Sequence, residues 1–267
     1  STPWWKRKQL LLIWAGLVIA ALSAAQLHGW LYEIPRNQAL SAAFLWEPIV
    51  DWFTIEAYPV TYAIRSWLLL NVLIPMRDVY LAAPWSAVLL LLMGIGWRIG
   101  GWRSAVVCSC FVGFIALSGW WERAMITAYM VTFAVGLAIA ISLPLGIWAA
   151  AKPTRARRML LACDTCQTFP SFIYLIPVIM LFGVNDVSAI GAVIIYAAIP
   201  MLRYTIEGLI NVPENLREAV DMAGATRWQR LWSMELPIAL PHLLIGLNQT
   251  VMFSLFMVII AAFIGTQ

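Results

Sequence analysis

A polar, charge-rich segment of this 267-residue chain, NVPENLREAVDMAGATRWQRLWSMELP at residues 211–237, lies between two strongly apolar stretches. Arg217, Glu218 and Asp221 are close enough in sequence to share one short helix, where opposite charges pair with each other or with a partner. The chain has no Walker lysine, nucleophile elbow or HExxH motif. We therefore expect docking chemistry in this segment and no enzymatic reaction.

Two short helices are expected within residues 211–237, which we call the elbow. Pro213 and Glu214 suit the first turn of a helix, and Gly224 suits a left-handed stop after it. Thr226 and Gln229 match a capping box, which would open a second short helix. Pro237 should then break the chain before the next apolar stretch.

The first expected helix, residues 213–223, has an apolar stripe and a polar surface. At helical spacing the stripe comprises Leu216, Ala219, Val220 and Ala223. We expect Arg217, Glu218 and Asp221 to lie on other faces, open to a soluble partner. Mixed charges and flanking apolar stretches argue against two alternatives, a helix-turn-helix that reads DNA and a merely amphipathic surface loop.

Composition places the chain in a membrane. Hydrophobic residues make up 63% of the sequence and charged residues 11%, and the mean hydropathy is +0.84. A soluble domain of this length could not bury so much apolar surface. The predicted fold class is therefore all-α, a polytopic integral membrane helical bundle.

About seven membrane spans are predicted, because a helix needs roughly 20 apolar residues to cross about 30 Å of hydrocarbon. They lie near residues 10–27, 85–101, 103–119, 124–151, 160–183, 188–206 and 238–265. Basic residues favour alternate loops, beginning with Lys6, Arg7 and Lys8, which predicts a cytoplasmic N-terminus and a cytoplasmic elbow. The first apolar run lacks a small-residue cleavage site, so we expect a retained helix rather than a signal peptide.

Residues 28–82 do not form a clean predicted span, because polar residues interrupt the stretch from Tyr62 to Tyr80. We expect an amphipathic helix on the outer face of the membrane. The alternative is a tilted span, which would invert the two helices that follow. The last predicted span ends outside near Gln267, so a cytoplasmic C-terminus would need one further helix.

Several stretches carry a family resemblance. Glu218-Ala219, Gly224 and Met234-Glu235-Leu236-Pro237 match the EAA signature of ABC importer permeases, although Val220 and Met234 replace an alanine and an isoleucine. The resemblance to permease subunits of glycine betaine, proline and choline importers rests on ISLPLGI at 141–147, DTCQTFPSFIYLIPVIMLFG at 164–183 and GLNQTVMFSLFMVIIAAFIG at 246–265. It divides the chain into an accessory N-terminal membrane region, 1–120, and a permease core, 121–267.

The resemblance implies a type I ABC importer with several subunits in a bacterial inner membrane. Two copies of the permease would form the path, two cytoplasmic ATP-binding subunits would bind ATP and Mg, and an extracytoplasmic substrate-binding protein would deliver the solute. This chain would hold no cofactor or metal and bind no nucleic acid. The solute would be glycine betaine, choline, proline or trimethylamine N-oxide. Departures from the family pattern at residues 185–187 and 198–200, near the outer end of the path, leave that choice open.

The residues expected to couple the permease to its ATPase all lie in the elbow. They are Arg217, Glu218, Ala219, Asp221, Ala223, Gly224 and Pro237.

Polar or helix-bending residues inside spans are candidates for the translocation path, because lipid makes them costly. The candidates are Gln167, Phe169, Pro170, Asn248, Gln249 and Thr250. Asn248, Gln249 and Thr250 would equally serve as hydrogen-bonding contacts between packed helices. Pro170 and Pro177 should bend their helix and free carbonyls toward a cavity. Arg203 and Glu207, at i and i+4, are expected to form an ion pair.

Aromatic faces would attract a quaternary ammonium solute. The matched region offers Phe169, Phe172, Tyr174, Tyr196, Tyr204 and Phe253, each of which packing explains at least as well. Cys163 and Cys166 have C-x2-C spacing but no second pair at zinc spacing, so neither a metal nor a disulfide is expected. Two other functions stay open: an importer permease for another small solute, such as sulfonates or amino acids, and a stand-alone secondary carrier or scaffold.

Overall fold

The computed structural model describes residues 4–27, 47–48 and 50–263, and the regular elements in those ranges are all helical. The chain divides into two units, Ser1–Trp52 and Phe53–Gln267. The first unit contains α1, Trp4–Leu27, which includes the span predicted at 10–27. Residues 28–46 of the predicted outer-face segment and residues 264–265 of the last predicted span lie outside the described residues.

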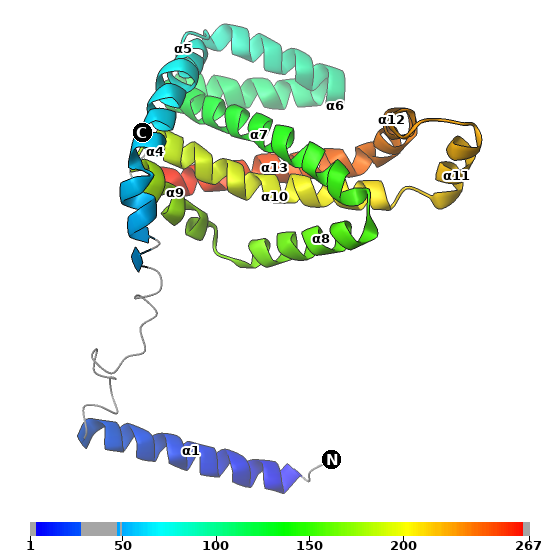
Figure 1. Ribbon diagram of the computed structural model, residues 1–267. Helices are drawn as coiled ribbons and strands as arrows, with labels where there is room; N and C mark the ends of the chain where they lie inside the picture. The colour runs from blue at the N-terminus through cyan, green and yellow to red at the C-terminus, as the bar shows by residue number, and fades with distance from the viewer. Residues whose placement is uncertain (1–3, 28–46, 49, 264–267) are drawn as a thin grey trace. The chain divides into compact units, whose positions relative to one another are not determined.

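Three long helices form the centre of the second unit: α7 (Trp121–Ala150), α10 (Asp186–Ile210) and α13 (Leu236–Phe263). Figure 1 shows them running side by side. They correspond to the spans predicted at 124–151, 188–206 and 238–265, and each is long and apolar enough to cross a membrane. α10 packs against both of the others and is the most deeply buried of the three.

Small residues let these three helices approach closely. A Cβ atom on Gly146 of α7 would stand 2.6 Å from Cγ2 of Thr205, and one on Gly246 of α13 would stand 2.9 Å from Cβ of Tyr204. The Ser142 hydroxyl of α7 donates a hydrogen bond of 2.9 Å to the carbonyl of Ala198 on α10. Close helix contact through glycine and serine is the usual packing mode in lipid, where apolar surface gives no preference for protein over acyl chains.

α6, Trp85–Leu117, folds back on itself at Gly101, whose φ of 71° is left-handed. The Cβ position of Gly96 lies 3.2 Å from Sγ of Cys108, although a straight helix would separate these residues by about 18 Å. The two arms match the spans predicted at 85–101 and 103–119. Each arm is roughly 24 Å long at 1.5 Å per residue, which is short against about 30 Å of hydrocarbon.

The span predicted at 160–183 is not one continuous helix. The structure divides it into α8 (Pro153–Thr168), the 3-10 turn η3 (Ser171–Tyr174) and α9 (Leu175–Phe182), with a bend of 108° between the helix before Phe169 and the one after Pro170. Phe169 and Pro170 are extended, with ψ of 140° and 137°. Pro170 lacks an N–H and disfavours the helical conformation in the residue before it, which explains the break. Pro177 lies in the first turn of α9, where proline requires no bend.

A run of short helices precedes α6 in the sequence. After the π turn η1 (Trp52–Glu56), it comprises α4 (Tyr58–Leu68), the π turn η2 (Leu69–Leu73) and α5 (Ile74–Leu81). Figure 1 shows α4 and α5 running across the bundle at its end opposite α11 and α12, two short helices described below. Arg65 of α4 donates a hydrogen bond of 3.0 Å to the carbonyl of Phe182, which ends α9. A helix that runs across the ends of the long helices fits an interfacial helix, and its place on the outer face of the membrane stays a prediction.

Candidate functional site

The elbow forms two short helices that stand beyond the ends of α10 and α13 (Figure 1). They are α11, Glu214–Met222, and α12, Arg227–Arg230, and the π turn η4, Leu231–Glu235, then leads into α13. The predicted capping box is present: the Thr226 hydroxyl accepts from the Gln229 N–H at 3.3 Å, and the Gln229 side chain accepts from the Thr226 N–H at 2.8 Å.

Gly224 ends α11 in the left-handed conformation, as the sequence predicts, with φ of 76°. The N–H of Gly224 donates to the Asp221 carbonyl at 3.0 Å, and the N–H of Ala225 donates to the Val220 carbonyl at 3.3 Å. This pair of hydrogen bonds is a Schellman motif, which satisfies the last carbonyls of the helix. The turn between α11 and α12 is therefore fixed by backbone geometry.

Pro237 does not break the chain as expected. Helical structure continues from α12 through η4 into α13, so that Arg227–Phe263 is one apolar helix of 37 residues. The π turn explains this, because the N–H of Leu236 donates to the carbonyl of Leu231, five residues back, and the wider turn absorbs the donor that proline lacks. α12 and α13 therefore form one continuous helical segment.

A network of ion pairs joins the parts of the elbow. The Glu235 carboxylate lies 3.3 Å from Nε of Arg217 and 3.2 Å from Nε of Arg230, and Arg230 also lies 2.7 Å from the Asp221 carboxylate. Arg217 donates in addition to the carbonyl of Leu209 near the end of α10. Arg217 and Asp221 are expected from the sequence to be open to a partner, but in the structure both form ion pairs within this internal network.

Glu218 is the acidic residue of α11 that stays open. It is exposed and makes no ion pair or hydrogen bond with the described part of the chain. No side chain of α11 is buried: along the apolar stripe Leu216 and Ala219 are exposed and Val220 is partly exposed, and Ala223, just after the helix, is exposed. The apolar stripe of α11 is thus not packed against its own bundle, which leaves this surface free for another protein.

Among the candidate path residues, Gln167, Phe169 and Pro170 lie at the break between α8 and η3. Phe169 and Pro170 are exposed there. Gln167 accepts a hydrogen bond of 3.4 Å from Arg203 of α10. The expected pair between Arg203 and Glu207 is present at 2.9 Å, and Arg203 also lies 2.6 Å from Asp164 of α8. These contacts fix α8 to α10 beside the break.

The structure separates Asn248, Gln249 and Thr250, which the sequence treats as one group. Thr250 is fully buried and donates a hydrogen bond of 2.8 Å to the Gly246 carbonyl of its own helix. Asn248 is exposed and Gln249 is partly exposed, and their side chains make no hydrogen bond with the residues that the structure describes. Thr250 occupies a packing position, and Asn248 and Gln249 keep free polar groups.

Three of the six candidate aromatic residues meet where the broken segment contacts α10 and α13. The ring centroids of Tyr174 and Tyr196 are 5.5 Å apart, and those of Tyr196 and Phe253 are 4.9 Å apart in a stacked arrangement. Cys163 and Cys166 are free thiols. No cluster of three metal-binding side chains occurs in the described ranges.

Comparison with known proteins gives a consistent set of relatives. A family model described as binding-protein-dependent transport system inner membrane component matches residues 142–267. Over 269 residues the chain is 46% identical to the trimethylamine N-oxide transport system permease protein TmoV of Ruegeria pomeroyi, an alignment that covers 100% of this chain and 41% of that relative. It is 36% identical over 218 residues to the glycine betaine/proline betaine transport system permease protein ProW of Escherichia coli, covering 81% of this chain and 61% of that relative.

A third relative is matched over most of its length. The glycine betaine/carnitine transport permease protein GbuB of Listeria monocytogenes is 35% identical over 190 residues, covering 70% of this chain and 67% of the relative. The chain spans only about two fifths of the first relative, TmoV. The region matched by the family model contains the broken segment, α10, the elbow and α13. The chain therefore belongs to the family of binding-protein-dependent transport system inner membrane components.

Proposed function

We propose that this chain is the permease core of an ATP-driven importer for a small compatible solute. In this function the bundle provides the path through the bacterial inner membrane, with the N-terminus and the elbow in the cytoplasm. Two ATP-binding subunits, a second copy of the permease and an extracytoplasmic substrate-binding protein complete the transporter. ATP and Mg belong to the ATP-binding subunits.

The observation that carries this proposal is the construction of the elbow. α11 exposes Glu218 and an unpacked apolar stripe. The ion pairs of Glu235 with Arg217 and Arg230 fix α11 to the continuous helix formed by α12 and α13. If an ATP-binding subunit binds α11 and moves it, α13 would therefore move with it. Such an element with two positions is what coupling between ATP hydrolysis and solute access requires.

The solute class is inferred from two observations. The names of the relatives refer to trimethylamine N-oxide, glycine betaine, proline betaine and carnitine. The neighbouring rings of Tyr174, Tyr196 and Phe253 beside the broken segment offer aromatic surface to a methylated cationic nitrogen. Both favour a methylated amine solute over a sulfonate or an ordinary amino acid.

Uptake into proteoliposomes tests the proposal. The full-length permease, its ATP-binding subunit and its substrate-binding protein would be reconstituted, and labelled glycine betaine, trimethylamine N-oxide, proline and choline supplied in turn. We expect ATP-dependent uptake of at least one. Uptake that is equal with and without ATP would contradict the proposal of an ATP-driven importer. If none of the four solutes is taken up in an ATP-dependent way, the solute belongs to another class.

A variant on α11 tests the coupling assignment in the same vesicles. Glu218→Lys reverses the charge of the open acidic residue and should lower ATP-dependent uptake at least about tenfold, since like charges at an interface cost several kcal/mol. The matched control is Glu122→Lys, an exposed acidic residue in the first turn of α7 at the opposite end of the bundle. Equal uptake by both variants would overturn the docking role of α11.

A further inference from the structure

A pocket outside the elbow and outside the candidate path has the chemistry of a binding site. Its volume is about 310 Å³, near the lower end of the range of roughly 300–1,000 Å³ for small-molecule sites. η2, α5, α7 and the turn before α10 form its walls, at the end of the bundle opposite the elbow (Figure 1). Its lining consists of Leu69, Leu73, Ile74, Arg77, Tyr129, Val184, Asn185 and Asp186.

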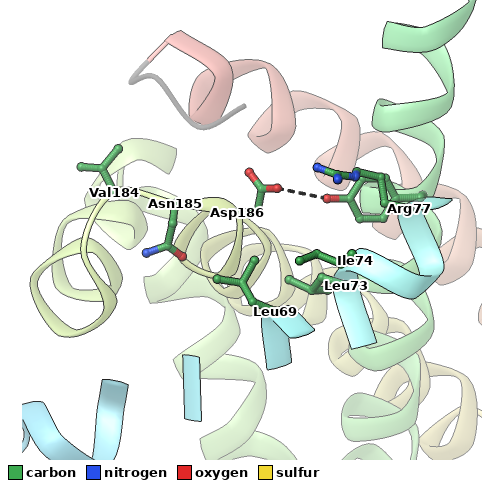
Figure 2. Close-up of a pocket in the computed structure, with 8 residues that line it drawn as sticks. Leu69, Leu73, Ile74, Arg77, Val184, Asn185 and Asp186 are labelled. Atoms are coloured by element: carbon green, nitrogen blue, oxygen red, sulfur yellow. Dashed lines mark hydrogen bonds between the residues drawn. The ribbon is translucent and has the colours of Figure 1, made fainter. Parts of the chain in front are cut away.

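The pocket combines an apolar floor with two opposite charges. Figure 2 shows the carboxylate of Asp186 and the guanidinium of Arg77 on the same side of the pocket, beyond the side chains of Leu69, Leu73 and Ile74. No ion pair of 4.0 Å or less joins Arg77 to Asp186 among the described residues. The two charges therefore face one cavity without neutralising each other by direct contact.

The positions of both charges are set by neighbours. The hydroxyl of Tyr129, a residue only 1% exposed, donates a hydrogen bond of 3.4 Å to Asp186. Arg77 has one ion pair, at 3.7 Å to the exposed Asp78, and its Nε has no hydrogen bond with the described part of the chain. The guanidinium thus keeps donors for a further acceptor, and Asp186 keeps oxygen lone pairs for a cationic group.

Asn185 has a structural role in this arrangement. Its side chain accepts from the N–H groups of Val187 and Ser188 at 2.9 and 3.3 Å and so caps α10. The same side chain donates to the carbonyl of Phe182. Because its polar atoms are already used, the ligand-binding chemistry of the pocket falls to Arg77 and Asp186.

We propose that this pocket binds a small zwitterion, with the anionic oxygen on Arg77 and the cationic nitrogen beside Asp186. Separated opposite charges over an apolar floor complement a solute that carries both charges and methyl groups, and they are a poorer match to a solute with one charge. The pocket lies at the end of the bundle opposite the elbow, which under the proposed function is the side where the solute would arrive, so this inference rests on the proposed function and makes the solute class narrower. It disfavours choline, which has the cation but no anionic oxygen.

Saturation-transfer difference NMR on the assembled transporter, without the substrate-binding protein, tests the site directly because that method detects weak binding. The probes are glycine betaine, trimethylamine N-oxide and choline. We expect N-methyl signals for the two zwitterions, at least about threefold weaker signals for choline, and loss of the zwitterion signals in Arg77→Gln and Asp186→Asn. Arg77→Lys, which keeps the charge, should retain part of the signal, and Glu122→Gln, an exposed residue outside the pocket, should retain all of it.

Several outcomes would overturn the site. They are the lack of a zwitterion signal in the natural protein, equal signals for choline, and unchanged signals in Arg77→Gln and Asp186→Asn. If one of these variants does not purify as a monodisperse complex, competition on the natural protein decides: acetate and tetramethylammonium, each carrying half of the charge pattern, should displace glycine betaine less well than unlabelled glycine betaine does. ATP-dependent uptake is measured separately, so a failed binding site and a failed importer assignment give different results.

Discussion

Glu235 holds the two short helices of the elbow together, because its single carboxylate forms ion pairs with two guanidinium groups. Its side chain is 15% exposed, and it is the point where Arg217 of α11 and Arg230 of α12 meet. Glu235→Gln would leave both arginines without that charge, which should cost on the order of 2 kcal/mol in stability. We expect ATP hydrolysis to persist while uptake falls at least about tenfold, since α11 would no longer be fixed to α13.

The ratio of solute imported to ATP hydrolysed, measured in proteoliposomes, checks this prediction. Glu214→Gln is the matched control, because Glu214 is 76% exposed and lies 3.9 Å from Arg217. An unchanged ratio in Glu235→Gln would mean that the ion pairs do not transmit force.

The local features of the elbow can be predicted from the sequence, whereas this network of ion pairs cannot. The capping box of Thr226 and the left-handed Gly224 depend on residues at most five positions apart, so the sequence determines them directly. Glu235 pairs with Arg217 and Arg230 only because the chain turns back at Gly224. Opposite charges at such separations have no periodic signature, so the sequence does not show that Arg217 and Asp221 pair within the elbow.

At the level of elements, close helix packing gives the next prediction. Gly246→Leu would push α13 away from α10, because a Cβ atom there stands 2.9 Å from Cβ of Tyr204. Overpacking of this kind costs about 1–3 kcal/mol, so the variant should lose its folded, monodisperse form at lower temperature. Gly136→Leu in α7 is the matched control, since its Cβ position has no atom within 4 Å. Equal thermal losses in fluorescence-detected size exclusion would show that the contact between α10 and α13 is not tightly packed.

The elements themselves were partly predictable. Spans with long uninterrupted apolar runs, such as α7 and α10, follow from hydropathy alone. The 108° break between α8 and α9 does not, because Pro170 predicts a bend but not its size. The contact of η3 with α10 and α13, which the sequence does not reveal, holds the broken segment in place. At Pro237 the sequence predicts a break that does not occur, because a π turn lets the helix continue through the proline.

At the scale of the whole molecule, the arrangement predicts opposite sides of the membrane for two exposed surfaces. α11 stands at one end of the bundle, and α5 lies across the other (Figure 1). Single cysteines would be introduced at Met222 and at Asp78 after replacement of Cys108, Cys110, Cys163 and Cys166. In intact cells a membrane-impermeant maleimide should label Asp78→Cys and spare Met222→Cys, because the basic loops predict a cytoplasmic elbow. Labelling of both after the membrane is opened serves as the control. If Asp78→Cys is protected in intact cells and reacts only after the membrane is opened, α5 does not lie on the outer side, and the zwitterion pocket would lose its place at the start of transport.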